Sequence, residues 1–347
     1  MLLEPARREG RRFLNPVPTM VGDPRTMYKV LPKFFFGGKA RRPSQPLGPF
    51  VTDTRVFDTA PASGLRVTWM GHSTMLIEMD GVRVLVDPMW DERASPNRWV
   101  GPKRFFAPPL PLDQLPKLDA VLISHDHYDH LGERTVRRLA RLQPKVEWIA
   151  PLGVGGVLAG IGVRRWRELD WMSEAVVGEV GVGEARADES RVSDVRAGEL
   201  RVTALPTRHF SGRGLWNRFE TLWASFALVG PRHRVYYGAD SGEWAGFAEI
   251  GARFGPFDLT MLEIGASDPL WAEIHMGPEG AVRSFRAMGG EGLLMPIHWG
   301  LFDLALHHWR QPMECVSSVE GLPLWSPTPG EPTEVIPGVE VRSEWWR

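Results

Sequence analysis

Short apolar segments of strand length begin at residue 65 and recur through the rest of the chain. Residues 65–70, 74–79 and 82–86 predict three consecutive strands, and Asp80-Gly81 between the last two predicts a hairpin turn. The apolar run 118–123 predicts a buried strand. Further strands are predicted at residues 146–150, 200–205, 222–229, 234–237, 259–264 and 293–297.

Helical spacing appears in two other segments. Apolar residues three positions apart predict a helix over residues 133–142, and a second helix is predicted over 279–288. Residues 173–199, rich in Gly, Glu, Asp and Arg, are predicted to form a surface loop or a weak hairpin. Strand meanders followed by strands mixed with helices predict an α/β (α+β) fold, in which two sheets are sandwiched between helices.

The first 60 residues differ from the rest of the chain. They are rich in Pro, Gly, Arg and Lys and show no sustained hydrophobic period. We therefore predict that residues 1–60 form an extended N-terminal arm, packed on a single catalytic domain of residues 61–347. The local basic charge leaves two readings open, a solvated tail or a contact with an anionic surface.

Composition narrows the classes of function. Of the 347 residues, 43% are apolar and 24% are charged, which is typical of a soluble globular enzyme. A net charge of -1 argues against nucleic-acid binding. Cys315 is the only cysteine, which excludes an intrachain disulfide and a zinc site made of thiolates, and fits a reducing compartment. With no secretory signal and no apolar run of membrane-spanning length, we expect a cytoplasmic location.

The strongest chemical signal is the segment His125-x-His127-x-Asp129-His130. It directly follows the predicted buried strand 118–123, so its side chains can be directed inward from the loop at the end of that strand. Several imidazoles and a carboxylate cannot be buried together at low cost without partners. A metal ion would satisfy them, and these residue types are the ligands that zinc accepts.

Three further candidate ligands, His209, Asp240 and His298, each follow a predicted strand. We assign His125, His127 and His209 to a first ion, and Asp129, His130 and His298 to a second. Asp240 is predicted to bridge, because only a carboxylate offers two oxygens to two metals. Two ions about 3.5–4 Å apart would lower the pKa of a shared water towards about 7.

This ligand pattern resembles that of the metallo-β-lactamase superfamily. Other segments narrow the resemblance, over residues 13 to about 312, to the phospholipase D family that hydrolyses N-acylphosphatidylethanolamine. These segments are Phe13-Leu14-Asn15-Pro16-Val17-Pro18-Thr19, Gly71-His72-Ser73-Thr74, Arg93-Ala94-Ser95-Pro96, Gly101-Pro102-Lys103-Arg104-Phe105, Glu168-Leu169-Asp170-Trp171, Arg253-Phe254-Gly255-Pro256-Phe257-Asp258 and Ile297-His298-Trp299-Gly300.

The resemblance implies a four-layer αβ/βα sandwich with a binuclear metal site between the sheets. It also implies that His275 orients the phosphate or acts as the acid for the leaving alkoxide, the alternative being a solvent-facing loop histidine. The predicted catalytic groups are His275, Asp129 and Asp240. His72 and Asp87 are predicted to orient metal ligands.

The implied activity is that of a phosphodiesterase of phospholipase D type. A hydroxide bridging two Zn²⁺ ions, or Mn²⁺ or Fe in their place, would attack the phosphorus of N-acylphosphatidylethanolamine-like phospholipids. N-acylethanolamine and phosphatidic acid would be released. The predicted partners are a phospholipid and, peripherally, the inner membrane surface; the oligomeric state stays open, a homodimer being one option. Six aromatic residues are assigned either to an acyl-chain groove or to core packing: Trp216, Phe219, Trp223, Trp271, Trp299 and Phe302.

Other readings keep the same scaffold. A soluble hydrolase of a phosphorylated lactone or a cyclic phosphodiester would use the same metals. A di-iron redox protein would carry Glu where this chain has His127, so that reading is disfavoured. Residues 173–199 and 211–223 depart from the animal phospholipases and flank His209, so the substrate is the least constrained part of the prediction.

Overall fold

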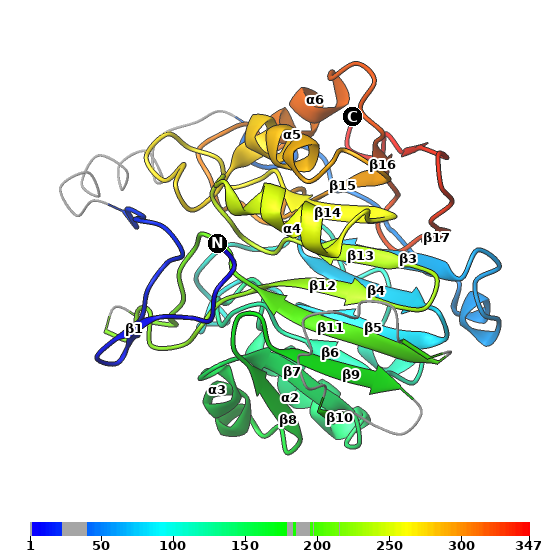
Figure 1. The fold of residues 1–347 in the computed structure, drawn as a ribbon. Helices are drawn as coiled ribbons and strands as arrows, with labels where there is room; N and C mark the ends of the chain where they lie inside the picture. The colour runs from blue at the N-terminus through cyan, green and yellow to red at the C-terminus, as the bar shows by residue number, and fades with distance from the viewer. Residues whose placement is uncertain (1, 23–39, 179–182, 185–194, 197, 215) are drawn as a thin grey trace.

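The computed structural model describes residues 2–22, 40–178, 183–184, 195–196, 198–214 and 216–347. Two seven-stranded β-sheets pack face to face, with helices on their outer faces (Figure 1). The fold class predicted from the sequence, a sandwich of two sheets between helices, is therefore confirmed.

The first sheet has the strand order β17-β3-β4-β5-β6-β7-β8. Its strands are antiparallel from β17 to β5 and parallel from β5 to β8. Parallel neighbours need crossover connections, and the helices α2 (Glu133–Leu142) and α3 (Val154–Ile161) provide two of them. The strand bounds are β3 Leu65–Gly71, β4 Thr74–Met79, β5 Val82–Val86, β6 Ala120–Leu122, β7 Glu147–Pro151, β8 Trp166–Leu169 and β17 Pro332–Glu334.

The second sheet has the strand order β10-β9-β11-β12-β13-β14-β15. It is antiparallel as far as β13 and parallel from β13 to β15. The helices α4 (Gly246–Phe254) and α5 (Gly277–Ala287) form its crossovers. The strand bounds are β9 Glu174–Gly178, β10 Gly183–Glu184, β11 Glu199–Leu205, β12 Ser225–Val229, β13 Arg234–Tyr237, β14 Leu259–Glu263 and β15 Leu293–Ile297.

Short elements complete the described chain. The N-terminal segment forms a two-stranded hairpin and places Leu3 and Phe13, each 1% exposed, in the main core. Near the C-terminus, α6 lies beside α5 and β16 lies beside β15, while β18 pairs with β16. The bounds are β1 Arg8–Glu9, β2 Arg12–Phe13, β16 Trp325–Ser326, β18 Val341–Arg342, α6 Gln311–Ser317, and the 3₁₀ helices Thr54–Asp58 and Leu112–Gln114.

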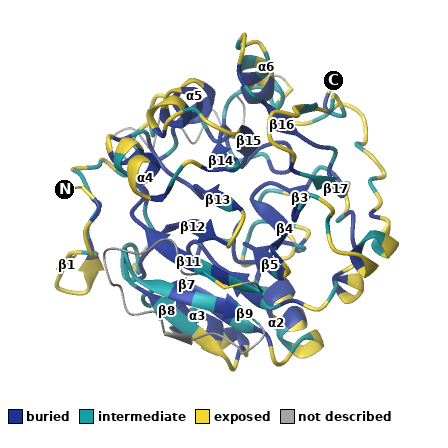
Figure 2. Cartoon of the chain, turned by 45° about the vertical axis from the view of Figure 1, so that its right-hand side comes forward, coloured by how far each residue is buried: buried dark blue, intermediate teal, exposed yellow. Residues whose placement is uncertain are grey.

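The alternation of side chains in the first sheet explains its two cores. In β4, Met75 and Ile77 belong to the large core that contains the second sheet, whereas Leu76 lies in a core with Val136 and Leu139 of α2. Successive residues of a strand point to opposite faces. Both faces are therefore covered, and Figure 2 shows the central strands of the sheets buried while the outer surfaces of the helices are exposed.

Some predicted boundaries were wrong. Residues 174–178, predicted as part of a surface loop or weak hairpin, form the strand β9, whose antiparallel pairing with β10 fits the hairpin alternative. The position at the surface was wrong, because β9 also pairs with β11 and buries Ala175 and Val177. Residues 179–182, 185–194 and 197 of the predicted loop lie outside the described residues. The strand predicted from residue 222 begins only at Ser225, because Ala224 donates its amide to the Ser124 carbonyl of the first sheet's metal-motif loop.

Among the described residues, every helix is too short or too polar to cross a membrane.

Candidate metal centre

All seven predicted ligands lie at the ends of strands and meet at one edge of the sandwich. His125, His127, Asp129 and His130 come from the loop after β6 of the first sheet. The second sheet contributes the rest from the segments after β11, β13 and β15: His209, Asp240 and His298.

The first group consists of His125, His127, His209 and Asp240, whose ligand atoms all lie within 4.8 Å of one another. His127 Nδ1 is 2.8 Å from His125 Nε2 and 3.3 Å from His209 Nε2. Asp240 Oδ2 is 3.6 Å from His209 Nε2. This group has the membership that we predicted for the first ion, with Asp240 at its border.

The second group consists of His72, Asp129, His130 and His298. Asp129 Oδ2 lies 3.2 Å from His298 Nε2 and 3.6 Å from His130 Nε2. Asp240 reaches this group too, because its Oδ1 is 3.2 Å from His130 Nε2 and its Oδ2 is 3.1 Å from His298 Nε2. Asp240 therefore stands between the two groups, which is the position required of a bridging ligand.

His72, which we predicted to orient metal ligands, is itself a member of this group. Its Nε2 is 3.0 Å from Asp129 Oδ2, and its ring centroid is 4.0 Å from that of His298. His72, Asp87 and His298 have φ values of 55°, 41° and 61°, in the left-handed region that non-glycine residues rarely occupy. Such strain persists where the surrounding structure holds it, often at functional sites.

The chemistry of these atoms fits divalent cations. His130 Nε2 and Asp240 Oδ1 are buried and have no hydrogen-bond partner of suitable geometry among the described residues. A buried polar atom without a partner is costly. The imidazole nitrogens and carboxylate oxygens that converge here are the donors preferred by zinc, manganese and iron, so a cation would complete both groups.

The electrostatics of the histidines differ between the two groups. Burial lowers the pKa of His125 and His209 well below the usual histidine value, which favours the neutral form that binds metals. For His298 burial acts in the same direction, but the nearby carboxylates of Asp240 and Asp129 outweigh it and raise the pKa to about 10. The two carboxylates therefore favour positive charge at His298, whereas burial lowers the pKa of His72 in the same group to about 3.

Asp87 holds one ligand in place from behind. Its fully buried carboxylate lies 2.7 Å from His130 Nδ1 and accepts hydrogen bonds from the Ser124 amide and hydroxyl and from the Tyr237 hydroxyl. With Nδ1 occupied by Asp87, His130 directs Nε2 into the site. His209 is fixed in the same way, because its Nδ1 lies 2.9 Å from the Ile274 carbonyl oxygen.

Glu263 belongs to the site and was missed by the sequence analysis. It ends β14, is fully buried, and places Oε2 at 2.6 Å from His275 Nδ1. Its Oε1 accepts the amides of Ser241 and Met276. Burial raises the pKa of Glu263. The available signal was a single carboxylate within the apolar segment 259–264, which was interpreted only as a strand.

His275 lies beside both groups. Its ring centroid is 5.0 Å from that of His209 and 5.3 Å from that of His298. The ligand atoms of Asp240, Glu263, His275 and His298 form a third close set. With Nδ1 engaged by Glu263, the other ring nitrogen is the one available to a substrate.

The six aromatic residues divide between core and surface. Trp223 and Trp299 are 1% and 3% exposed and belong to the main core, whereas Trp216 is 90% exposed. Phe302 is buried with its ring edge-on to His72, and Trp271 is half-buried. Phe219 lines a cavity of about 690 Å³ together with residues 13–15 and 17–19 of the N-terminal segment.

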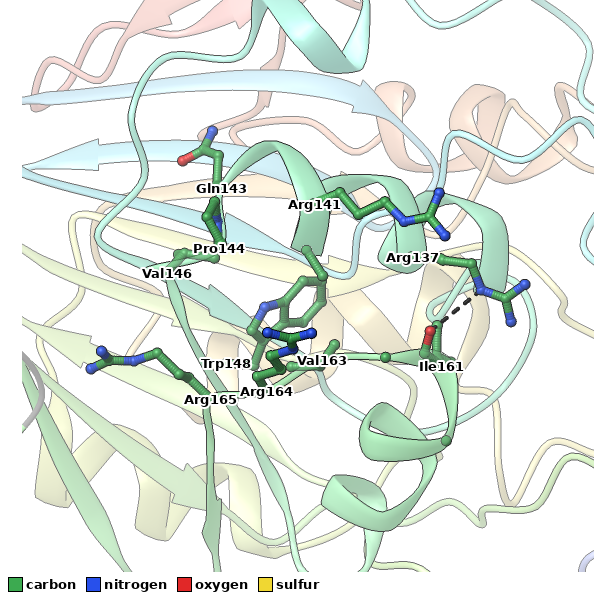
Figure 3. A pocket seen from close by; sticks show the side chains of 13 residues that line it. Arg137, Arg141, Gln143, Pro144, Val146, Trp148, Ile161, Val163, Arg164 and Arg165 are labelled. Atoms are coloured by element: carbon green, nitrogen blue, oxygen red, sulfur yellow. Dashed lines mark hydrogen bonds between the residues drawn. The ribbon is translucent and has the colours of Figure 1, made fainter.

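A second cavity, of about 600 Å³, lies between the C-terminal ends of α2 and α3 (Figure 3). Its lining includes Arg137, Arg141, Arg164 and Arg165 around Trp148. In Figure 3 the guanidinium groups of Arg137 and Arg141 point to one side and that of Arg165 to the other. The positive charges of Arg137, Arg141 and Arg165 therefore do not converge on one point. The described residues that line this cavity include none of the seven candidate metal ligands.

Comparison with known proteins agrees with this geometry. The family model described as a beta-lactamase superfamily domain matches residues 82–299. An uncharacterised protein of Mycobacterium tuberculosis is 44% identical over 311 residues, covering 88% of this chain and 77% of its own. The N-acyl-phosphatidylethanolamine-hydrolyzing phospholipase D 1 of Caenorhabditis elegans is 35% identical over 250 residues, covering 70% of this chain and 65% of that protein.

Solved structures share the fold. Igni18, a metallo hydrolase from the archaeon Ignicoccus hospitalis, has a TM-score of 0.53 at 20% identity and covers 78% of this chain and 97% of its own. An isothiocyanate hydrolase from Delia radicum gut bacteria has a TM-score of 0.55 at 17% identity, covering 78% of this chain and 100% of its own. The chain therefore belongs to the metallo-β-lactamase superfamily of metal-dependent hydrolases, and its relatives include phospholipases D that hydrolyse N-acyl-phosphatidylethanolamine.

Proposed function

We propose that this protein is a phosphodiesterase of phospholipase D type, which hydrolyses N-acylphosphatidylethanolamine-like phospholipids to N-acylethanolamine and phosphatidic acid. The observation that carries the proposal is the placement of Asp240 between two ligand groups, with the pair His275–Glu263 beside them. The relatives from Caenorhabditis elegans and from Saccharomyces cerevisiae, the latter 27% identical over 252 residues, carry this activity in their names.

The two groups would hold two divalent cations, Zn²⁺ by preference and Mn²⁺ or Fe as alternatives. Cations bound there would supply Lewis acidity and a water of lowered pKa. In the reaction a bond forms between water oxygen and phosphorus, and the bond from phosphorus to the head-group oxygen breaks. One proton must reach the departing alkoxide.

His275 is positioned to act on the substrate. Glu263 Oε2 lies 2.6 Å from its Nδ1, which leaves the opposite ring nitrogen for the substrate, and its ring centroid lies 5.0 Å from that of His209. That nitrogen would bind a phosphate oxygen or deliver the proton to the alkoxide. Asp240 and Asp129 act as ligands and as the negative charge that retains the cations.

The cavity beside Phe219 would accept an acyl chain. Its volume of about 690 Å³ and the side chains of Phe13, Leu14 and Val17 suit an apolar group. The exposed Trp216 and Trp99, 90% and 73% accessible, would contact a lipid surface peripherally.

The test is direct. The purified protein, loaded with Zn²⁺, is incubated with N-acylphosphatidylethanolamine in mixed micelles, and released N-acylethanolamine is measured by mass spectrometry. Parallel assays contain a phosphorylated lactone or a soluble aryl phosphodiester. Asp240→Asn is the inactive control, and Asp113→Asn, an exposed carboxylate paired with Arg138, is the matched control. Turnover of the soluble substrates without release of N-acylethanolamine would overturn the lipid assignment.

A further inference from the structure

The backbone of His209 is held by a side chain that lies far away in the sequence. Asn15 Nδ2 donates to the His209 carbonyl oxygen at 2.7 Å, and the His209 amide donates to Asn15 Oδ1 at 3.0 Å. His209 lies beyond the end of β11, so no strand neighbour binds these two groups. A carboxamide carries an NH2 donor group and a carbonyl acceptor side by side, so a single Asn side chain can bind both backbone groups.

The same N-terminal segment is anchored next to His209 a second time. The Arg208 guanidinium donates to Thr19 Oγ1 at 3.0 Å and to the Pro18 carbonyl oxygen at 3.1 Å. It also pairs with Glu273 at 2.6 Å, and the Met20 amide donates to the same carboxylate oxygen at 2.6 Å. These bonds join residues 15–20, the segment of His209 and the loop before α5 into one network.

The network surrounds the ligand on both sides. The Glu273 loop continues directly to Ile274, whose carbonyl oxygen lies 2.9 Å from His209 Nδ1. Asn15 fixes the backbone of His209 and Ile274 fixes its ring. His125 and His127 of the same ligand group come from the other sheet. The distance across the group therefore depends on how firmly His209, which follows β11 of the second sheet, is held relative to His125 and His127 of the first sheet.

We propose that Asn15 is a positioning residue of the first cation site, and that residues 13–20 complete this site by holding His209 in ligand geometry. This inference rests on the proposed function only in requiring that the His/Asp groups bind cations. Metal ligands must keep distances within about 0.2 Å of ideal, and residues that orient ligands typically contribute about tenfold to a hundredfold in metal affinity.

The test measures cation binding without activity. The metal-free full chain and its Asn15→Ala and Asn15→Asp variants are titrated with Zn²⁺ in competition with a chromophoric chelator, and with Co²⁺, whose absorption reports ligand geometry. Asn97→Ala is the matched control, because Asn97 also hydrogen-bonds a backbone amide but lies in an exposed loop. Circular dichroism confirms that each variant is folded.

Wild type and Asn97→Ala should bind two cations. In Asn15→Ala one of the two should bind about tenfold to a hundredfold more weakly, while the other changes by less than about threefold. Asn15→Asp can still accept the His209 amide but places an oxygen against the His209 carbonyl oxygen, so it should bind cations as weakly as the alanine variant. If Asn15→Ala does not fold, the affinities of Asn15→Asp alone test the inference.

Equal affinities in folded wild type and Asn15 variants, with an unchanged Co²⁺ spectrum, would overturn the inference while leaving the proposed function intact. A uniform loss of thermal stability with both affinities unchanged would have the same meaning, because it shows a structural role only. Absence of cation binding by the wild type would overturn both proposals.

Discussion

Two buried polar clusters join the sheets at opposite ends of the sandwich. One is the group of candidate ligands, which includes His72 in the turn before β4 and Asp240 after β13. The other is built around Asp80, in the turn that follows β4, and contacts Arg232 and His233, which precede β13. Both clusters consist largely of histidines and aspartates, yet their hydrogen bonding is very different.

The Asp80 cluster is complete within the chain. The carboxylate accepts the amides of Arg232 and His233 at 2.9 and 3.0 Å, His233 Nδ1 lies 2.8 Å away, and Arg232 Nε lies 3.1 Å away. At the other end, His130 Nε2 and Asp240 Oδ1 have no suitable partner among the described residues. The same residue types thus serve stability where donors match acceptors, and indicate an external cation where they do not.

The largest expected effect comes from Asp240→Asn. Asparagine has neither the negative charge nor the second carboxylate oxygen with which Asp240 would bridge two cations. Hydrolysis should therefore fall below detection, and the cation stoichiometry should drop below two. Elemental analysis and the micelle assay measure both. Retention of two tightly bound cations in this variant would break the contrast between the two ends.

Removal of the cations should have the next largest effect, on stability. A ligand that binds only the folded state stabilises it by about 4.1 kcal/mol when its free concentration is about 1,000 times Kd. Exhaustive chelation should therefore lower the denaturant midpoint of the wild type. Chelation should destabilise the Asp80→Asn variant by the same free energy as the wild type, because effects at distant sites add to within about 0.5 kcal/mol. An unchanged midpoint after chelation would count against the site.

Asp80→Asn should reduce the free energy of unfolding by about 1–3 kcal/mol, since the donors of buried His233 and of exposed Arg232 lose their charged acceptor. Activity of the folded, metal-loaded variant should be unchanged. Denaturant unfolding and the micelle assay test the two statements. Lost activity in a fully folded variant would show that the two clusters are coupled.

The smallest expected effect is a change with pH in the stability difference between wild type and Asp80→Asn. Burial raises the pKa of Asp80, but the hydrogen bonds from Arg232 and His233 outweigh it and hold the pKa below the usual aspartate value. A depressed pKa stabilises the fold above the unfolded-state pKa, and this contribution is lost as pH falls through the folded-state value. The stability gap between wild type and Asp80→Asn should thus be constant near pH 7 and shrink below about pH 4. A gap that widens in acid would contradict this assignment.

The sequence predicted the fold to the extent that hydrophobic periodicity determines it. Strands such as β3, β4 and β5 are short, largely apolar runs separated by turn residues, and they were placed within a residue or two. The helix α3 was missed because its sequence, Val154–Ile161, is rich in glycine and apolar residues and has no polar face. β9 could be predicted only as an alternative, the weak hairpin, because its short apolar run lies within a charged, glycine-rich region.

The sequence could predict those parts of the site that are recognisable from residue type and position alone. The seven candidate ligands come from loops that follow predicted strands, so their residue types and positions could be proposed without coordinates. Glu263 and Asn15 could not, because their roles depend on contacts between segments that are distant in the sequence. A glutamate in a strand and an asparagine before a proline carry no local sign of their partners, His275 and His209.

The order in which the ligands occur along the chain limits when the site can be built. Its first members lie in the β3–β4 turn and after β6, but His298 follows the last strand of the second sheet. During synthesis, a ribosome must therefore release nearly the whole polypeptide before a cation finds its full set of donors. A cation that needs the full donor set would then be bound only where folding finishes, and the local supply of ions there would influence which one is taken up.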